Sequence, residues 1–287
     1  MISIIVPAFN ESVAISDTVK GLLNIIHSHE YSGGEVLVVD DGSSDQTGDK
    51  AENAGARVLR HPHNVGYGRA LKTGILAAQH DTIVIIDADL TYPADSIPDL
   101  LRVFEEEHYD MVVGERTGSY YRGGMAKWLL RLVLRALVEF SAGRSIPDIN
   151  SGLRVFSKAS VLHYLNHLCN TFSFTTSLTL AYMMTGRFVG YVPIEFFERR
   201  GSAKVRLVRD SLRTLQYVVQ AINYYNPLKI FLLISIASFI ASISGFVLAL
   251  ATNLTAPYFL GIGGLLLSLL VFCLGLLADL LRQIMSK

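Results

Sequence analysis

Two long apolar runs in the last sixty residues constrain this chain most strongly. Residues 230–251 and 258–278 contain no charged side chain. Each run reaches the length of roughly 20 apolar residues that an α-helix needs to cross a bilayer. The short link at residues 252–257 therefore predicts a hairpin of two transmembrane helices. The alternative is a pair of buried core helices, which would need protein on all sides of both, and a soluble domain has little to cover them.

The basic residues that flank the runs predict the orientation of the hairpin. Lys229 precedes the first run, Arg282 and Lys287 follow the second, and the link carries none. Basic residues favour the cytoplasmic side, so both ends of the hairpin are expected there. The apolar start at residues 2–6 is too short for a signal peptide and lacks a basic flank. We therefore expect an integral protein of a plasma- or ER-type membrane, with its N-terminal part in the cytosol.

The first 115 residues alternate short apolar runs with longer amphipathic ones. The expected strands are residues 3–7, 35–41, 56–60, 82–89 and 110–115. The expected helices are residues 13–27, 47–54, 68–79 and 97–107. This alternation predicts a Rossmann-like α/β domain with a doubly wound, mostly parallel sheet. Ligands of such sheets bind at the carboxyl ends of the strands.

The segment between this domain and the hairpin is basic and amphipathic. Arg206, Arg209 and Arg213 alternate with apolar residues over positions 205–225. A basic amphipathic helix just before a membrane span is expected to lie in the headgroup layer. The chain is thus divided into a cytosolic α/β domain at residues 1–204, an interfacial helix at 205–228 and the hairpin at 229–287.

The charge balance argues against nucleic acid as a partner, and the cysteines argue against a disulfide framework or a cysteine metal site. The 287 residues include 25 basic and 25 acidic side chains, so no overall field attracts nucleic acid. The two cysteines, Cys169 and Cys273, cannot form a disulfide framework and lack metal-ligand spacing. A reduced cytosolic setting agrees with this usage.

Paired carboxylates end two of the expected strands. Asp40 and Asp41 end one strand, and Asp87 and Asp89 end another. Alternate residues of an extended chain point the same way, so we expect Asp87 and Asp89 to approach one object together. Two carboxylates held close together repel each other unless a cation lies between them. Mg²⁺ or Mn²⁺, bridging to phosphate oxygens, is a suitable cation. One Asp-x-Asp alone would more often be a solvated turn, but two clusters favour a metal–phosphate site.

These motifs resemble the family 2 inverting glycosyltransferases with the GT-A fold, and among them the dolichyl-phosphate mannose synthase-like branch. The resemblance covers residues 2–205 and rests on IIVPAFNE (4–11), VVDDGSSDQT (38–47) and DADL (87–90). It implies transfer of a hexose from a nucleotide-sugar, GDP-mannose or a UDP-sugar, to a polyprenyl or dolichyl phosphate at the cytoplasmic membrane face. Thr91 stands where close relatives often carry Gln.

The same resemblance implies the residues that hold the donor. The base and ribose would be bound by Pro7, Asn10, Glu11, Asp40 and Asp41. Asp87 would lie against the ribose–diphosphate, and Asp89, exposed at the strand end, would ligate the metal with it. Residues 199–204 resemble the mobile loop that closes on the diphosphate, which implies roles for Arg200, Ser202 and Lys204.

A glycine-rich stretch at residues 63–69 opens one of the expected helices. It lacks the ending of a P-loop and follows the wrong strand for a dinucleotide fingerprint. We interpret it as a tight turn that packs near the donor. Lys72, in the helix that follows, is a candidate for binding the diphosphate.

The absence of an expected general base indicates which kind of acceptor the protein uses. Family members that glycosylate hydroxyls often carry a Glu-Asp pair at a helix start, where this chain has Thr175 and Thr176. A phosphate monoester is largely a dianion at pH 7 and needs no deprotonation. It needs positive charge, and Asp148, in the loop at 148–152, is then the only candidate for a base.

The positive charge lies in a segment that follows the strand at 110–115. Lys127, Arg131 and Arg135 recur every four residues beside Trp128, which places them on one side of a helix. The resemblance implies that Arg116 and Arg131 seat the lipid phosphate, and we add Lys127 and Ser151 to this group.

Two other functions fit part of the sequence. A membrane polysaccharide synthase would need a Gln-x-x-Arg-Trp motif and a wider channel, whereas the only tryptophan is Trp128. An inactive membrane scaffold would have eroded acidic motifs, and both are intact. The identity of the sugar and nucleotide, the choice of metal and homo-oligomer formation are left open.

Overall fold

The computed structural model of the chain contains two compact units, Met1–Val218 and Val219–Lys287. It describes residues 1–27, 31–118, 135, 138–140, 142–198 and 207–285. The first unit is built on a seven-stranded sheet with the order β3-β2-β1-β4-β6-β5-β7. The strands are β1 (Ile2–Ala8), β2 (Glu35–Asp40), β3 (Arg57–Arg60), β4 (Thr82–Ile85), β5 (Met111–Thr117), β6 (Arg154–Ser157) and β7 (Val189–Glu195).

The sheet is mostly parallel, as the sequence predicts. β1 runs parallel to β2 and β4, and β5 runs parallel to β7, whereas β6 is antiparallel to both β4 and β5. The sequence pattern does not predict β6 or β7. β6 is only four residues long and begins with Arg154, and β7 contains Gly190 and Pro193. Proline is tolerated in β7 because this strand lies at the edge of the sheet.

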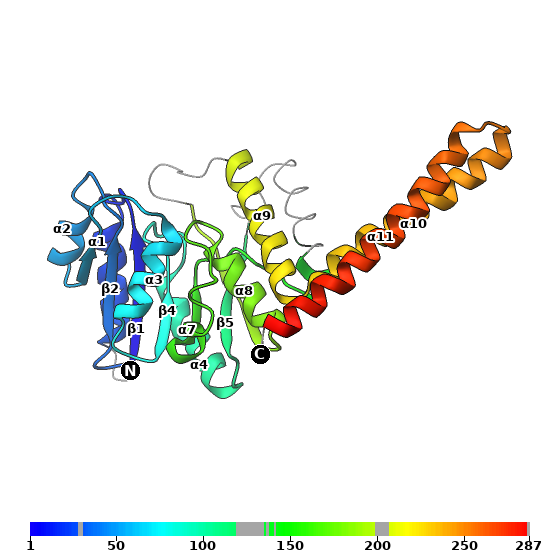
Figure 1. Cartoon of the computed structure of the whole chain (residues 1–287). Coiled ribbons are helices and arrows are strands. Elements are labelled where there is room, and N and C mark those ends of the chain that lie inside the picture. The colour runs from blue at the N-terminus through cyan, green and yellow to red at the C-terminus, as the bar shows by residue number, and fades with distance from the viewer. Residues whose placement is uncertain (28–30, 119–134, 136–137, 141, 199–206, 286–287) are drawn as a thin grey trace. The chain divides into compact units, whose positions relative to one another are not determined.

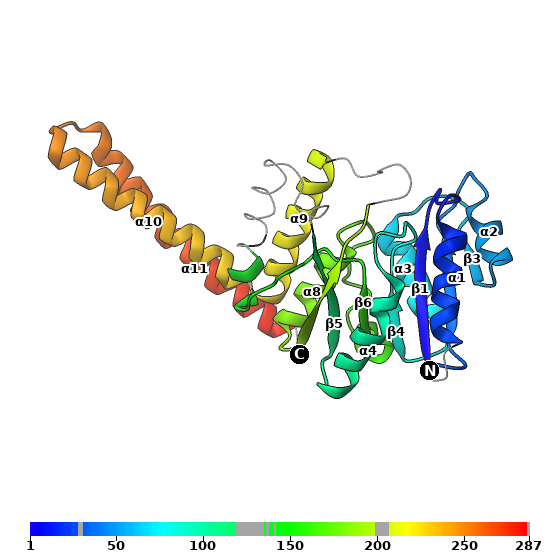
Figure 2. The same ribbon diagram turned by 180° about the vertical axis from the view of Figure 1, so that it is seen from behind.

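Helices cover both faces of the sheet. They are α1 (Ile15–Ile26), α2 (Thr47–Asn53), α3 (Tyr67–Ala77), the 3-10 turn η1 (Ala94–Ser96), α4 (Ile97–Glu106), α7 (Lys158–Leu162) and α8 (Phe174–Met184). Leu22 of α1 and Leu100 of α4 share one core cluster with Val38 of β2. α3 packs on the opposite face, where a Cβ added at Gly74 would lie 2.4 Å from Ile5 Cγ2. Figures 1 and 2 show these two faces from opposite sides.

One boundary differs from the prediction in a way that matters for the site. β4 ends at Ile85, so Asp87 and Asp89 lie in the turn beyond it and not in a strand that continues to residue 89. Leu90 has a left-handed φ of 60°, which takes the chain out of the extended conformation. The prediction that the strand extends to Asp89 is therefore wrong, and an extended chain is not what places Asp87 and Asp89.

The predicted C-terminal helices are confirmed. α9 (Leu207–Tyr225) is followed by α10 (Pro227–Thr252) and α11 (Ala256–Met285), and Asn253, with a left-handed φ of 55°, ends α10. α10 and the span Ala256–Ile284 have mean hydropathies of 2.4 and 2.5 and are long enough to cross a membrane.

Small and hydroxyl residues bring the two long helices together. Ser242 Oγ donates to the Gly261 carbonyl at 2.6 Å, and Ser235 Oγ donates to the Ser268 carbonyl at 2.9 Å. Close approach of small residues is how helices pack within a membrane. The outer surface is apolar, and Leu250 and Phe259 are 78% and 74% exposed.

Candidate active site

The predicted site residues lie along one edge of the sheet, the edge that is formed by the ends of the strands. The carboxyl ends of β1, β2 and β4 meet there because these strands are parallel neighbours. β6 runs antiparallel between β4 and β5, so its amino end reaches the same edge as the carboxyl end of β5. The acidic residues after β2 and β4, Arg116 of β5 and the loop before β6 therefore share one edge.

The loops after β1 and β2 are tied to each other. The Asn10 amide donates to Ser43 Oγ at 2.9 Å, and the Ser44 amide donates to Asn10 Oδ1 at 2.8 Å. Asn10 has a left-handed φ of 52°, which turns the chain out of β1. The Glu11 amide donates to Thr47 Oγ1 at 2.8 Å. The two sequence motifs predicted to hold the nucleotide thus form one structural unit.

Pro7 and Asp40, which are predicted to contact the nucleotide, are both buried. Pro7 is buried within β1, where it pairs with Val39 of β2. Asp40 is 7% exposed, and its Oδ1 accepts the Ser43 amide at 3.0 Å. Both residues shape the edge of the sheet, and their contact with the nucleotide stays a prediction.

Asp41 has its carboxylate turned into the protein. Its Oδ1 accepts a hydrogen bond from the Val65 amide at 3.1 Å and its Oδ2 one from the Gly66 amide at 2.8 Å. His61 Nδ1 lies 2.7 Å from Oδ1, and Asp41 is 2% exposed. Asp41 therefore stabilises the glycine-rich loop. Its implied contact with base or ribose stays a prediction.

Asp89 is oriented by Thr91. Its Oδ1 accepts hydrogen bonds from the Thr91 hydroxyl at 2.6 Å and the Thr91 amide at 3.1 Å. A hydrogen bond from α1 holds the turn before Asp89, since Thr18 Oγ1 donates to the Ala88 carbonyl at 3.0 Å. Asp89 is only 8% exposed, so the expectation of an exposed Asp89 is wrong.

Asp87 is half-buried and has a tyrosine as its partner. The Tyr67 hydroxyl donates to Asp87 Oδ1 at 2.8 Å. Burial, followed by the charge of Asp87, raises the pKa of Tyr67 well above its ordinary value, so Tyr67 remains a donor. On its other side Asp87 is crowded by the backbone of the loop before β6, because a Cβ at Gly152 would lie 2.5 Å from Asp87 Oδ2.

The glycine-rich stretch forms the tight turn that the sequence predicts, and α3 begins directly after Gly66. Lys72 of this helix is 7% exposed, and its Nζ donates to the Leu168 carbonyl at 2.5 Å. Burial lowers the pKa of Lys72. Because its ammonium points to a loop carbonyl inside the protein, the structure gives Lys72 a structural role and does not support its predicted contact with the diphosphate.

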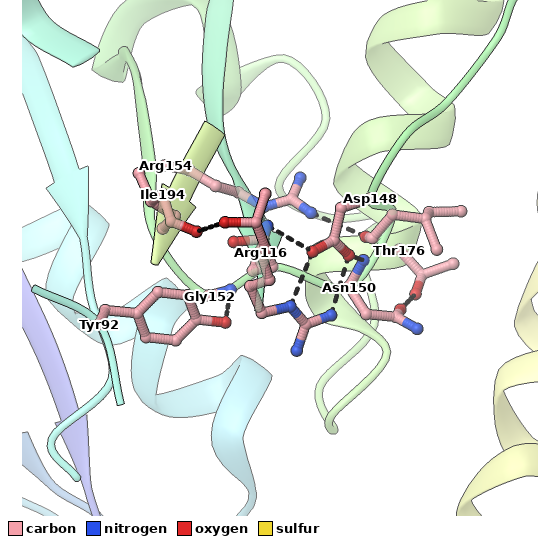
Figure 3. Close-up of polar contacts among 11 residues, drawn as sticks. Tyr92, Arg116, Asp148, Asn150, Gly152, Arg154, Thr176 and Ile194 are labelled. Atoms are coloured by element: carbon pink, nitrogen blue, oxygen red, sulfur yellow. Dashed lines mark hydrogen bonds and ion pairs between the residues drawn. The ribbon is translucent and has the colours of Figure 1, made fainter. Parts of the chain in front are cut away.

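An ion pair joins β5 to the loop before β6 (Figure 3). Arg116 Nε lies 2.7 Å from Asp148 Oδ2, and its Nη2 donates to Asp148 Oδ1 at 2.9 Å. The Asn150 amide donates to the same carboxylate at 3.1 Å. The Arg116 guanidinium also lies over the Phe196 ring, 5.4 Å from its centroid. Asp148 therefore orients Arg116.

The charge state of Asp148 follows from two opposed effects. Burial raises the pKa of this carboxyl, but the hydrogen bonds and charge of Arg116 outweigh it and hold the pKa below its ordinary value. A general base works best when its pKa lies near the operating pH. A carboxylate with a lowered pKa, already paired with arginine, is a weak base, which argues against the predicted role of Asp148 as a base.

A second arginine, Arg154, lies fully buried beside this ion pair (Figure 3). Arg154 Nε donates to the Ser151 carbonyl at 2.8 Å, and its Nη2 donates to the Ile149 carbonyl at 2.8 Å. Its Nη1 donates to Thr179 Oγ1 at 2.7 Å. Among the residues that the structure describes, no carboxylate lies within ion-pair distance of Arg154. Its charge is therefore held by carbonyl and hydroxyl dipoles.

The start of α8 lies beside the loop before β6. Thr175 and Thr176 are 3% and 1% exposed, and Thr176 Oγ1 donates to Asn150 Oδ1 at 2.5 Å. Both threonines are thus structural, and neither supplies a base. Ser151 is fully buried, so its hydroxyl does not reach solvent here, which disagrees with its predicted contact with the acceptor phosphate.

Five of the predicted site residues lie outside the described part of the chain. They are Lys127, Arg131, Arg200, Ser202 and Lys204. Their roles remain predictions.

The carboxylates at the end of β4 are suited to a hard divalent ion. Asp87 and Asp89 provide oxygen ligands, which Mg²⁺ and Mn²⁺ prefer. Within the described ranges, no group of three or more His, Cys, Asp or Glu side chains is placed to hold a metal. A metal at this edge would take its remaining ligands from phosphate oxygens and water, as Mg²⁺ does in many nucleotide sites.

Three residues of the site were missed from the sequence. Tyr67 binds Asp87, Arg154 holds the loop before β6, and the Tyr92 hydroxyl accepts the Gly152 amide at 2.7 Å. Burial raises the pKa of Tyr92 to about 12. Only Arg154 carried a signal, because an arginine within the apolar run LRVF (153–156) is unusual in a buried strand.

The fold and the site together define a glycosyltransferase of the GT-A type. Residues 3–165 match the model of glycosyl transferase family 2. The chain therefore belongs to glycosyl transferase family 2.

Curated relatives and solved structures agree with this assignment. The chain is 28% identical to dolichyl-phosphate hexose transferase of Haloferax volcanii over 71% of its own length and 86% of that protein. It is 28% identical to undecaprenyl-phosphate 4-deoxy-4-formamido-L-arabinose transferase of Serratia proteamaculans over 86% of its length and 74% of that protein.

The fold is similar to that of glucosyl-3-phosphoglycerate synthase from Mycobacterium tuberculosis. Its complex with Mn²⁺, uridine-diphosphate-glucose and phosphoglyceric acid superposes with a TM-score of 0.63 at 21% identity, over 77% of this chain and 79% of that one. Its complex with Mg²⁺ and uridine-diphosphate gives a TM-score of 0.64 at 22% identity, over 77% and 79%.

Proposed function

We propose that this protein transfers a sugar, with inversion, from a nucleotide-sugar to a polyprenyl phosphate of the dolichyl type. The donor would be GDP-mannose or a UDP-sugar, as the sequence resemblance implies. The relatives from Haloferax volcanii and Serratia proteamaculans act, by their names, on dolichyl phosphate and undecaprenyl phosphate. Both acceptors are long prenyl chains that end in a phosphate.

The Arg116–Asp148 pair is the observation that carries this proposal. A hydroxyl acceptor needs a general base, but Asp148 is bound to Arg116 by two side-chain contacts and its pKa is lowered. At the start of α8 both candidate positions are buried threonines. A phosphate monoester is largely a dianion at pH 7, so it attacks without a base.

Local charge also favours a phosphate. Arg116 and Asp148 cancel one another, and the buried Arg154 leaves one net positive charge among these three side chains. In a partly buried setting such a charge attracts a dianion more strongly than it would in water. The predictions for Arg131 and Lys127 would add further positive charge to the acceptor side.

The reaction is a single displacement. An acceptor phosphate oxygen forms a bond to the anomeric carbon, on the face opposite the diphosphate. The bond between that carbon and the diphosphate oxygen breaks, and the electron pair leaves with the nucleoside diphosphate. Asp89 and Asp87 would hold Mg²⁺ or Mn²⁺, which when bound neutralises charge on the diphosphate. We propose that Arg200, Ser202 and Lys204 contact the same diphosphate.

The hairpin would place this reaction at a membrane. We propose that residues 1–204 form the catalytic domain on the cytoplasmic side, that 205–228 lie in the interface and that 229–287 anchor the chain. Lys229, Arg282 and Lys287 flank the apolar spans at their expected cytoplasmic ends. The lipid phosphate would then emerge on the side of the catalytic domain.

Acceptor kinetics of an Arg116→Lys variant test the proposal. Lysine keeps the charge but cannot reproduce the two-pronged contact of a guanidinium. We expect acceptor kcat/KM to fall about tenfold, which corresponds to the loss of one charge-assisted hydrogen bond. Nucleotide affinity, measured by calorimetry, should not change. The rate of the wild-type protein should also fall as the pH drops through about 6, where the phosphate takes up its second proton.

Arg144→Lys is the matched control, because Arg144 makes a similar contact with Phe188, 5.5 Å from the ring centroid. Its acceptor kinetics should equal those of the wild-type protein. Acceptance of a free prenol as readily as its phosphate would refute the proposal, as would an Arg116→Lys variant with normal acceptor kinetics.

A further inference from the structure

Tyr67, the first residue of α3, connects the two halves of the site. Its hydroxyl donates to Asp87 Oδ1 at 2.8 Å. Its ring stacks on Phe172, with centroids 5.4 Å apart and planes inclined by 4°. Phe172 precedes α8 and is 48% exposed. One side chain therefore contacts a donor-side carboxylate and the loop that leads into the acceptor-side helix.

The turn directly before Tyr67 fixes the position of this residue. Asp41 accepts the amides of Val65 and Gly66 at 3.1 and 2.8 Å, which holds the chain directly before α3. Gly66 has φ 109° and ψ 152°, a conformation that is essentially restricted to glycine. The turn thus delivers Tyr67 to the edge of the sheet in one defined orientation.

The loop that carries Phe172 is docked on the same helix. The Arg69 amide donates to the Asn170 carbonyl at 3.0 Å, and Lys72 Nζ donates to the Leu168 carbonyl at 2.5 Å. A Cβ at Gly68 would lie 2.3 Å from the Cys169 carbonyl oxygen, so helix and loop are in direct backbone contact. The Tyr67–Phe172 stack is therefore part of a rigid interface.

We propose that Tyr67 is a positioning residue for the nucleotide donor. Its hydroxyl holds the Asp87 carboxylate in the orientation that the divalent ion and the diphosphate require, and the stack on Phe172 keeps the hydroxyl in place. This inference rests on the proposed function, because it assigns Asp87 to the donor. It adds a residue whose hydroxyl touches neither nucleotide nor acceptor and acts through Asp87.

Tyr67→Phe tests the role of the hydroxyl, because the ring and its stack are kept. The probes are GDP and UDP, titrated by calorimetry with Mn²⁺ and with EDTA, and the nucleotide that the wild-type protein binds is used for all variants. We expect affinity in Mn²⁺ to fall about tenfold, the loss of one hydrogen bond to a charged group. Affinity in EDTA should not change. Electron paramagnetic resonance of free Mn²⁺ should report the same loss of metal binding in the nucleotide complex.

Tyr164→Phe is the control for loss of a tyrosine hydroxyl. Tyr164 OH lies 2.8 Å from Thr185 Oγ1, a contact of the same length outside the site. This variant should bind nucleotide and Mn²⁺ like the wild-type protein. In an Asp87→Asn background, Tyr67→Phe should cause no further loss, since the carboxylate it orients is gone.

A Phe172→Leu variant tests the stack while leaving the hydroxyl in place, and its Mn²⁺-dependent affinity should fall by less than that of Tyr67→Phe. Equal nucleotide affinities for Tyr67→Phe and wild type in Mn²⁺ would overturn the inference, whatever the change in thermal stability. So would an equal loss in Mn²⁺ and in EDTA. Failure to glycosylate polyprenyl phosphate would overturn the proposed acceptor only, because these binding data do not depend on the acceptor.

Discussion

The Arg116–Asp148 pair shows how one contact sets the chemistry of a residue. Asp148 is 2% exposed on its side chain and Arg116 is 16% exposed. Burial alone would favour the protonated carboxyl, whereas Arg116 favours the carboxylate and prevails. Removing one partner of such a pair leaves an uncompensated group and costs far more than the pair itself contributes.

An Arg116→Met variant should therefore weaken the pH dependence that Asp148 contributes to stability. In the wild-type protein the lowered pKa stabilises the fold at neutral pH, and this contribution is lost as the pH falls through the folded-state pKa. In the variant the side-chain contacts of Arg116 are lost, whereas burial and the backbone amides of residues 116 and 150 remain. The pKa of Asp148 therefore rises above its wild-type value, and less of its contribution to stability is lost as the pH falls. We expect a deficit of about 3–5 kcal/mol at pH 7 that shrinks towards about pH 4, measured by urea unfolding.

Adding Asp148→Asn to Arg116→Met should remove this pH dependence, because no carboxyl is left to titrate. A single variant whose deficit does not shrink as the pH falls would contradict the account, since a raised pKa of Asp148 must reduce the deficit at lower pH.

At the scale of elements, the contact between α3 and the loop before α8 decides where several site residues lie. Gly66 and Gly68 allow this contact, since a side chain at either position would meet the backbone of residues 169–171. The glycine-rich stretch therefore allows α3 to pack against the loop before α8. Its amides at Val65 and Gly66 are already bound by Asp41, which argues against a phosphate cradle there.

Gly66→Ala should destabilise the first unit by about 2 kcal/mol more than Gly186→Ala. Both positions have positive φ, 109° and 82°, so both substitutions strain the backbone. A Cβ at Gly66 would in addition lie 2.7 Å from the Asn170 carbonyl oxygen, whereas nothing lies within 4 Å of one at Gly186. Chemical denaturation measures the difference, and equal losses of stability would show that the contact does not constrain the turn.

At the scale of the whole molecule, a sheet domain and an apolar hairpin form separate compact units. Within the described residues of the hairpin, the hydroxyls of Ser235 and Ser242 donate to backbone carbonyls of the other helix, and the Ser235 hydroxyl also contacts that of Ser268. Its large apolar residues face outward, with Ile240 and Leu266 58% and 63% exposed. Such a surface is stable only when lipid or protein covers it.

Truncation after Tyr225 should separate nucleotide binding from action on a membrane substrate. The shortened protein keeps α9 and should bind nucleotide with wild-type affinity. Its activity on polyprenyl phosphate in liposomes should fall about tenfold or more, because enzyme and acceptor no longer share one surface. Activity on a short, water-soluble prenyl phosphate should be retained. Equal activities of both forms on liposomes would contradict a positioning role of the hairpin.

Local patterns in the sequence determined much of this protein. Uninterrupted apolar runs predicted the hairpin, and alternating periodicities predicted the mostly parallel α/β sheet, because burial of a strand or a helix face depends on neighbouring residues. The motifs at residues 4–11, 38–47 and 87–90 carried the resemblance to family 2. Positions of strand ends then indicated one shared edge for the site.

Only the tertiary structure decided what each site residue touches. Asp41 bonds to a loop 24 and 25 residues away, Arg116 to Asp148 32 residues away, and Lys72 to a carbonyl 96 residues away. Such contacts depend on how distant segments pack and leave no periodic signal in the chain. The sequence therefore determined which strand ends meet at the site, and packing determined which side chains lie there and what each of them contacts.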